Sequence, residues 1–161
     1  MQSFRLTRSL MAISVFGVAL ATSGIARADD TVATSGDLEA AIGAYPGTQS
    51  KVNGNVEAEF EDGYVKIEYD LTGLEPNANG GLHIHSGTSC KDAEKVGGHY
   101  YAPKADGDYW KNANWVSDSK GEAHGSFQLI SGLNRKDNLG HAVVVHASNG
   151  SRIGCGILEK E

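Results

Sequence analysis

Residues 56–72 read VEAEFEDGYVKIEYDLT, and this stretch contains two runs in which apolar and charged side chains alternate. The first run covers 56–61, and the second covers 65–72. A period of two is typical of strands that bury one face, and Glu61-Asp62-Gly63 between the runs predicts a hairpin turn. The stretch therefore predicts an antiparallel pair of half-buried strands.

The rest of the chain shows the same signals in shorter pieces. Further strands are predicted at about residues 40–45, 82–86, 113–118, 123–130, 141–147 and 153–158, with Gly, Pro and Asn turn signals between them. Asp37 to Ala41 is the only helical signal, and it is short and runs into Gly43. Many short antiparallel strands predict an all-β fold, either a β-sandwich or a Greek-key β-barrel.

Length and charge limit the possible functions. The chain has 161 residues, of which 40% are hydrophobic and 21% are charged, so about one globular domain is expected. The net charge of −6 argues against a general nucleic-acid-binding protein, which needs a basic face for phosphates. Two cysteines are too few for a disulfide-dense small protein or a cysteine-rich zinc module.

The first 28 residues are predicted to be a signal peptide. Arg5 and Arg8 precede a run from Leu10 to Ile25 without a charge, and Ala26-Arg27-Ala28 places small residues where signal peptidase reads them. The apolar run is shorter than the roughly 20 residues that span a bilayer, so a membrane anchor is disfavoured. Cleavage after Ala28 would leave eleven basic and twenty acidic side chains, a net charge of −9.

The predicted domain plan follows from this cleavage site. Residues 1–28 are the signal peptide, 29–39 form an N-terminal segment, and 40–161 form the β-barrel domain. We expect the mature protein to be secreted, either extracellular or periplasmic, without a membrane partner. Such a compartment is oxidising, so Cys90 and Cys155 can pair there.

The residues that carry chemistry are histidines. His83 and His85 flank Ile84 on a predicted strand, so both imidazoles lie on one face of that strand. Two imidazoles on one face can bind one metal ion, although two exposed polar residues on the wet face of a sheet fit the same pattern. His146 ends an apolar run, and His99 follows two glycines within an aperiodic segment at 87–112, which predicts one long functional loop.

Imidazole donors suit copper, zinc and iron, whereas oxygen-rich sites suit calcium and magnesium. The other two histidines, His124 and His141, are predicted to be exposed. His124 lies in an alternating strand after Glu122, and His141 opens its strand beside Gly140.

Four motifs, in this order along the chain, resemble the copper/zinc superoxide dismutase family. They are Gly81-Leu82-His83-Ile84-His85 followed by Cys90, then Gly97-Gly98-His99-Tyr100, then Gly140-His141-Ala142-Val143-Val144-Val145-His146, and finally Ser151-Arg152-Ile153-Gly154-Cys155-Gly156. The resemblance covers about residues 40–158, and it implies an eight-stranded Greek-key β-barrel.

The resemblance also implies a copper site and an activity. It assigns the copper ligands as His83, His85, His99 and His146, the catalytic residues as Arg152 and His99, and the disulfide as Cys90–Cys155. Arg152 would guide the anionic substrate, superoxide, which is converted to dioxygen and hydrogen peroxide. This reaction needs a metal that cycles by one electron, and nitrogen ligands tolerate both oxidation states of copper.

Two departures from the family pattern predict a copper-only enzyme. The family's zinc subsite takes two histidines and an aspartate from the loop after the bridging histidine, but no histidine lies between His99 and His124. The segment 147–151 is also much shorter than the family's electrostatic loop. Both departures resemble the copper-only secreted branch of the family, so zinc is not expected.

Without zinc, another group has to orient His99. Carboxylates commonly orient metal-bound histidines, and the segment 104–111 contains two aspartates. Asp108 is the preferred candidate, with Asp106 close behind.

Two other functions fit part of the pattern. A non-catalytic copper-binding or copper-transfer protein could keep the fold, but such a protein often lacks a ligand or the arginine, and all are present here. A cupin-type metal oxidase also uses His-x-His, but it has a glutamate a few residues later, and here the next one, Glu94, lies nine residues beyond His85. Asn149-Gly150-Ser151 is a glycosylation sequon that we expect to be unused, because a glycan there would lie at the rim of the site.

Overall fold

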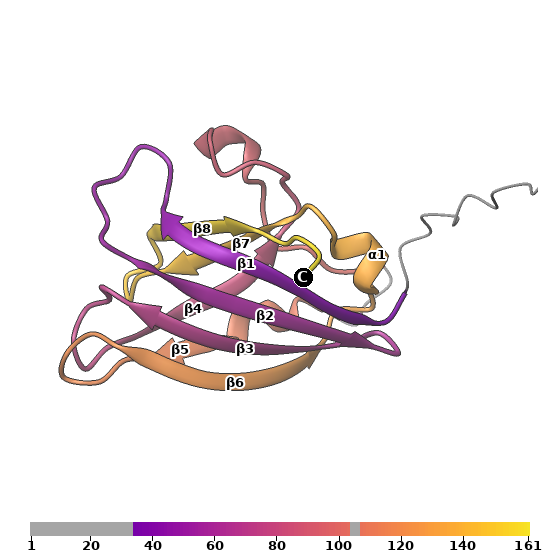
Figure 1. Ribbon diagram of the computed structural model, residues 1–161, viewed down its shortest axis with the longest axis horizontal. Helices are drawn as coiled ribbons and strands as arrows, with labels where there is room; N and C mark the ends of the chain where they lie inside the picture. Colours follow the sequence, from indigo (N-terminus) through magenta and orange to yellow (C-terminus); the bar gives the residue numbers. More distant parts are fainter. Residues whose placement is uncertain (1–33, 104–106) are drawn as a thin grey trace, which may run out of the picture. The chain divides into compact units, whose positions relative to one another are not determined.

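The computed structural model describes residues 34–103 and 107–161. Figure 1 shows strands and very few helices. The strands are β1 (Gly36–Ala44), β2 (Asn53–Glu61), β3 (Tyr64–Thr72), β4 (Asn79–His85), β5 (Asn114–Val116), β6 (Ala123–Ile130), β7 (Ala142–His146) and β8 (Arg152–Ile157). The helical turns are η1 (Ala93–Lys95), η2 (Tyr109–Asn112) and α1 (Arg135–Asn138). Within the described ranges, no helix is long and apolar enough to cross a membrane.

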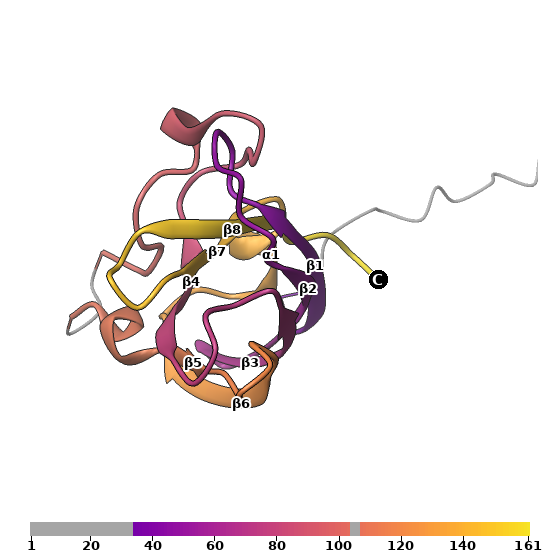
Figure 2. The ribbon, with the colours of Figure 1, turned by 90° about the vertical axis from the view of Figure 1, so that its left-hand side faces the viewer.

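The eight strands form one antiparallel sheet in the order β5-β4-β7-β8-β1-β2-β3-β6. The two end strands, β5 and β6, approach each other, so the sheet curls into a nearly closed barrel (Figure 2). Several strands that are neighbours in the sheet are distant in sequence. For example, β4 pairs with β7, and β3 pairs with β6. This arrangement confirms the predicted Greek-key β-barrel and places β4 and β7, which carry histidines, side by side.

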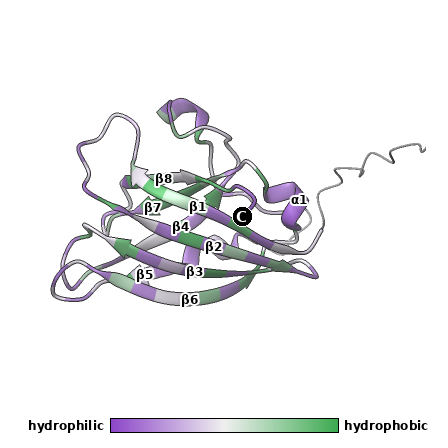
Figure 3. Cartoon of the chain, viewed as in Figure 1, coloured by the Kyte–Doolittle hydropathy of each residue, from purple (hydrophilic) through white to green (hydrophobic). Residues whose placement is uncertain are grey.

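Alternating side chains line the core, as the sequence predicted. In β2, Val56, Ala58 and Phe60 are at most 1% exposed, while the glutamates between them face outward. Figure 3 shows the resulting change between hydrophobic and hydrophilic residues along the strands. The chain turns from β2 to β3 at Asp62 and Gly63, whose φ angles of 48° and 82° are the left-handed values of a tight hairpin turn.

The helical signal at Asp37 to Ala41 was wrong, because these residues belong to β1. Leu38 and Ala40 are buried at 0% and 1% exposure, which is the alternation of a strand. The same residues pair with β2 over a continuous antiparallel ladder that begins at Gly36. Pairing with β2 and burial against the core outweigh the weak local helical preference of this short segment.

Candidate metal centre

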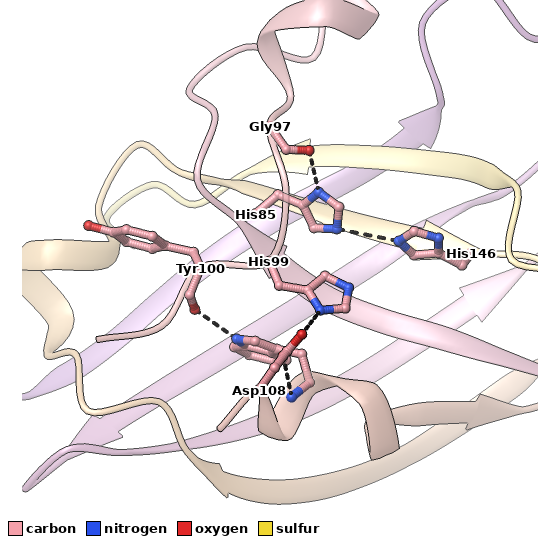
Figure 4. A network of polar contacts seen from close by, with 7 residues as sticks. His85, Gly97, His99, Tyr100, Asp108 and His146 are labelled. Atoms are coloured by element: carbon pink, nitrogen blue, oxygen red, sulfur yellow. Dashed lines mark hydrogen bonds and ion pairs between the residues drawn. The ribbon is translucent and has the colours of Figure 1, made fainter. Parts of the chain in front are cut away.

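Four histidines from three parts of the chain meet at one place, and Figure 4 shows three of them. His83 and His85 lie on β4, His146 is the last residue of β7, and His99 lies in the loop between η1 and η2. An isolated β-bridge between His85 and His99 holds this loop against β4. One nitrogen from each ring lies within 4.8 Å of the others, so the structure brings the four predicted copper ligands together.

Burial decides the protonation of these side chains. His83 is 8% exposed and His85 is 1% exposed, so the alternative of two histidines on a wet face is wrong. Burial lowers the pKa of His83 to about 3 and the pKa of His85 to about 4, and it also lowers the pKa of His146. All three rings are therefore neutral near pH 7, which is the form that binds a metal.

Hydrogen bonds orient two of the rings. The Nδ1 atom of His85 donates to the Gly97 carbonyl oxygen at 3.0 Å, and the Nδ1 atom of His146 donates to the Gly150 carbonyl oxygen at 3.0 Å. Since a carbonyl oxygen only accepts, each neutral ring carries its proton on Nδ1 and a lone pair on Nε2. The two Nε2 atoms lie 3.3 Å apart. Two lone pairs at this distance repel each other unless a cation lies between them, so the arrangement fits a metal ion.

His83 provides a second indication of a metal. Both of its ring nitrogens are buried, and neither has a hydrogen-bond partner among the described residues. A buried polar atom without a partner costs free energy, and a metal bound at one nitrogen would remove part of that cost. A set of four imidazole nitrogens is a donor set that suits copper.

Asp108, the preferred of the two predicted carboxylates, is hydrogen-bonded to His99. Its Oδ2 atom accepts a hydrogen bond from Nδ1 of His99 at 2.7 Å (Figure 4). Its Oδ1 atom accepts from the backbone N–H of Trp110 at 3.2 Å, which places Asp108 at the start of η2. The buried Trp110 ring donates from Nε1 to the Tyr100 carbonyl oxygen at 2.7 Å and so anchors this turn. The other candidate, Asp106, lies outside the described residues.

Arg152 lies next to the histidine cluster. It is the first residue of β8 and pairs with His146 across the sheet. Its Nη2 atom donates to the Gly97 carbonyl oxygen at 2.7 Å, and the same oxygen accepts from His85. Its Nη1 atom donates to the Tyr45 hydroxyl at 3.0 Å. The guanidinium therefore shares a hydrogen-bond acceptor with a predicted copper ligand.

Cys90 and Cys155 form a disulfide, as predicted. Cys90 lies in the loop that leads to η1, and Cys155 lies in β8, three residues after Arg152. The bond therefore ties the loop that carries Gly97 and His99 to the strand that carries Arg152.

A cavity of about 290 Å³ opens beside the cluster. His83, His99 and His146 line it on one side, and Lys111 and Asn114 are among the residues that line the rest. Of the described residues that line the cavity, Lys111 alone is charged. An anion that approaches through this cavity therefore meets a cation next to three of the four histidines.

The other two histidines lie outside the cluster. His124 is exposed, as predicted, and its Nδ1 atom lies 3.1 Å from a carboxylate oxygen of Asp70. The prediction that His141 is exposed was wrong, because its ring stacks on Tyr100 with the centroids 4.1 Å apart. His141 precedes β7 in the turn that follows α1, and the loop that carries Tyr100 folds over this turn.

Comparisons with known proteins agree with the metal centre that the four histidines indicate. A family profile described as copper/zinc superoxide dismutase (SODC) matches residues 52–158. A copper-zinc superoxide dismutase of Humicola lutea is 33% identical over 111 residues, which cover 61% of this chain and 72% of the relative. A copper-zinc superoxide dismutase of Candida albicans has the same identity and coverage. One of Paramecium bursaria Chlorella virus 1 is 26% identical over 148 residues, which cover 73% of this chain and 78% of the relative.

Proposed function

The chain belongs to the copper/zinc superoxide dismutase family, and from this premise we propose that it is a copper-only superoxide dismutase. It converts superoxide to dioxygen and hydrogen peroxide. The observation that carries the proposal is the four-histidine cluster together with the hydrogen bond from His99 to Asp108.

Each functional side chain has a role that follows from its chemistry. Copper, when bound, supplies the one-electron oxidation and reduction that dismutation requires. The four imidazoles would hold it, and the Gly97 and Gly150 carbonyls orient two of the rings. The Arg152 guanidinium is positively charged and binds the superoxide anion through charged hydrogen bonds.

The proposal that zinc is not needed rests on the two nitrogens of His99. An imidazole bridges two metal ions only when both nitrogens are free to bind. In this protein Nδ1 of His99 donates to Asp108, which leaves one nitrogen for the copper cluster. A hydrogen-bonded carboxylate holds a metal-bound histidine in one tautomer and one orientation, so Asp108 does the orienting that a second metal would otherwise do.

Metal reconstitution of the mature protein tests this function. We expect copper alone to give about one copper per chain and full superoxide-dependent activity, and we expect added zinc to raise neither activity nor stability. His146→Ala should lose copper and activity, whereas the matched variant His124→Ala, which alters an exposed histidine outside the cluster, should keep both.

Other results would change the proposal in different ways. Stoichiometric zinc that survives mild chelation, with activity that falls when the zinc is stripped, would overturn the copper-only assignment and leave the dismutase activity standing. Stable copper binding without removal of superoxide would instead support a non-catalytic copper-binding or copper-transfer protein.

We also propose that the protein is exported after removal of residues 1–28. The support comes from the leader, in which two arginines precede an apolar run, and from the small residues of Ala26-Arg27-Ala28. The disulfide agrees with an oxidising compartment. Expression of the full chain in a secreting host, followed by N-terminal sequencing of the exported protein, should give Asp29 as the first residue. Protein that keeps its leader in the cytoplasm would contradict the proposal.

A further inference from the structure

Tyr45 connects three parts of the structure through one buried phenol. It lies in the connection between β1 and β2 and is 6% exposed. Its ring packs with Val96 and Cys155 beside the disulfide. Its hydroxyl donates to the Ala93 carbonyl oxygen at 3.2 Å and accepts from Nη1 of Arg152 at 3.0 Å. The hydroxyl therefore links the loop that precedes His99 to the first residue of β8.

These contacts restrain the guanidinium of Arg152. Nη1 is bound to the Tyr45 hydroxyl and Nη2 to the Gly97 carbonyl oxygen, so two different nitrogens are held by two different segments. The central guanidinium carbon also lies 5.8 Å from the centroid of the Tyr45 ring. Because a guanidinium is planar and has five N–H donors in a fixed geometry, two such contacts define its plane. The remaining N–H groups are left to bind an anion.

We propose that Tyr45 is a positioning residue for the reaction, and that its hydroxyl fixes the orientation of the Arg152 guanidinium. The proposal rests on the role in superoxide binding given to Arg152 above. Tyr45 lies 107 residues from Arg152 in sequence, so the contact exists only because β1 and β8 pair in the barrel. Gly97 alone would leave the guanidinium free to rotate about one hydrogen bond.

The variant Tyr45→Phe separates this role from packing, because the phenyl ring keeps its place among Val96 and Cys155 and only the hydroxyl is lost. Tyr64→Phe is a matched control, since Tyr64 is 43% exposed on β3. Both variants should have nearly the same melting temperature and copper content as the native protein.

Nitrogen-15 NMR of the metal-free mature protein tests the restraint without reference to activity. The chain has two arginines after residue 28, so their side-chain signals are easily assigned and Arg135 is an internal control. Its Nε atom donates to the Asp37 carbonyl oxygen at 2.8 Å, independently of Tyr45. In Tyr45→Phe we expect the Nη signals of Arg152 to broaden and their protons to exchange faster, with Arg135 unchanged. Identical Arg152 signals in both proteins would overturn the proposal.

The copper-loaded enzyme supplies a second measurement. Tyr45→Phe should lower kcat/KM about fivefold, which is less than the loss expected for removing Arg152 itself, because the positive charge stays and only its orientation is lost. In an Arg152→Gln background the same substitution should have no further effect, because Tyr45 acts through Arg152. An equal loss in both backgrounds would show that Tyr45 acts by another route. If Arg152→Gln itself leaves kcat/KM unchanged, the role given to Arg152 fails, and the NMR measurement still decides whether Tyr45 restrains it.

Discussion

The Nδ1 atom of His99 lies 2.7 Å from a carboxylate oxygen of Asp108. Both side chains are mostly buried, with the His99 side chain 23% exposed and the Asp108 side chain 14% exposed. The carboxylate is held in turn by the backbone N–H of Trp110, so its position does not depend on a flexible side chain alone. In the proposed copper-only enzyme, this contact would orient His99 as a copper ligand and leave its Nε2 atom for the metal.

Asp108→Ala is expected to lower copper affinity by roughly tenfold or more, because the partners that orient metal ligands commonly contribute this much. Competition against a copper chelator measures the change. Asp92→Ala is the matched control, since Asp92 caps η1 through a backbone N–H as Asp108 caps η2. Equal copper affinity in the Asp108 variant and the native protein would mean that the carboxylate does not orient His99.

Arg152→Gln is expected to lower kcat/KM about tenfold or more, because it removes the charged hydrogen bonds to the anionic substrate. Copper content and the visible copper spectrum should stay nearly unchanged, since Arg152 contacts the Gly97 carbonyl and no histidine nitrogen among the described residues. Arg135→Gln controls for the loss of one positive charge. Loss of copper from the Arg152 variant would show that the residue is structural.

Gly81→Ala is expected to release copper while the barrel stays folded. A Cβ atom at Gly81 would lie against the ring of His83, which would have to leave its position in the cluster. Gly43→Ala is a matched control on β1, where a Cβ would have nothing within 4 Å. Elemental analysis and circular dichroism of both variants check this, and a copper-replete Gly81 variant would contradict it.

Lys111→Gln is expected to lower kcat/KM at low ionic strength and to weaken its dependence on salt. Lys111 is the charged side chain that lines the cavity beside His83, His99 and His146. A local cation raises the concentration of an anionic substrate at the mouth of a site, and salt screens this attraction. Lys160→Gln, near the C-terminus, is the control. If both variants show the same salt dependence, superoxide does not approach past Lys111.

Removal of the disulfide by Cys90→Ser with Cys155→Ser is expected to lower the free energy of unfolding by on the order of 4 kcal/mol, because the closed segment is long. Urea unfolding of the metal-free protein measures this. Before reduction, the intact mass should be lower by two hydrogens than after reduction. Two thiols that react with an alkylating reagent in the native secreted protein would contradict the bond.

Local patterns in the sequence were enough for most of the strands and for the four histidines that meet in the structure. The alternation at 56–61 and 65–72 reports directly which side chains face the core, and the structure has β2 and β3 there. The histidine motifs keep their order and spacing along the chain, so the resemblance could name His83, His85, His99 and His146 without any knowledge of distances. The helical interpretation of Asp37 to Ala41 failed, because pairing with β2 and burial outweigh the weak helical preference of this segment.

Apart from Asp108, which the sequence offered as the partner of His99, only the tertiary structure decided which groups hold these residues in place. Gly97 and Gly150 act through their carbonyl oxygens, and a backbone oxygen has no side-chain signal that a sequence could show. Tyr45 reaches Arg152 because β1 pairs with β8, and nothing in the residues around position 45 indicates that pairing. The ligand types were thus determined locally, whereas the orientation of the His85 ring and of the Arg152 guanidinium depends on hydrogen bonds between segments that only the folded chain brings together.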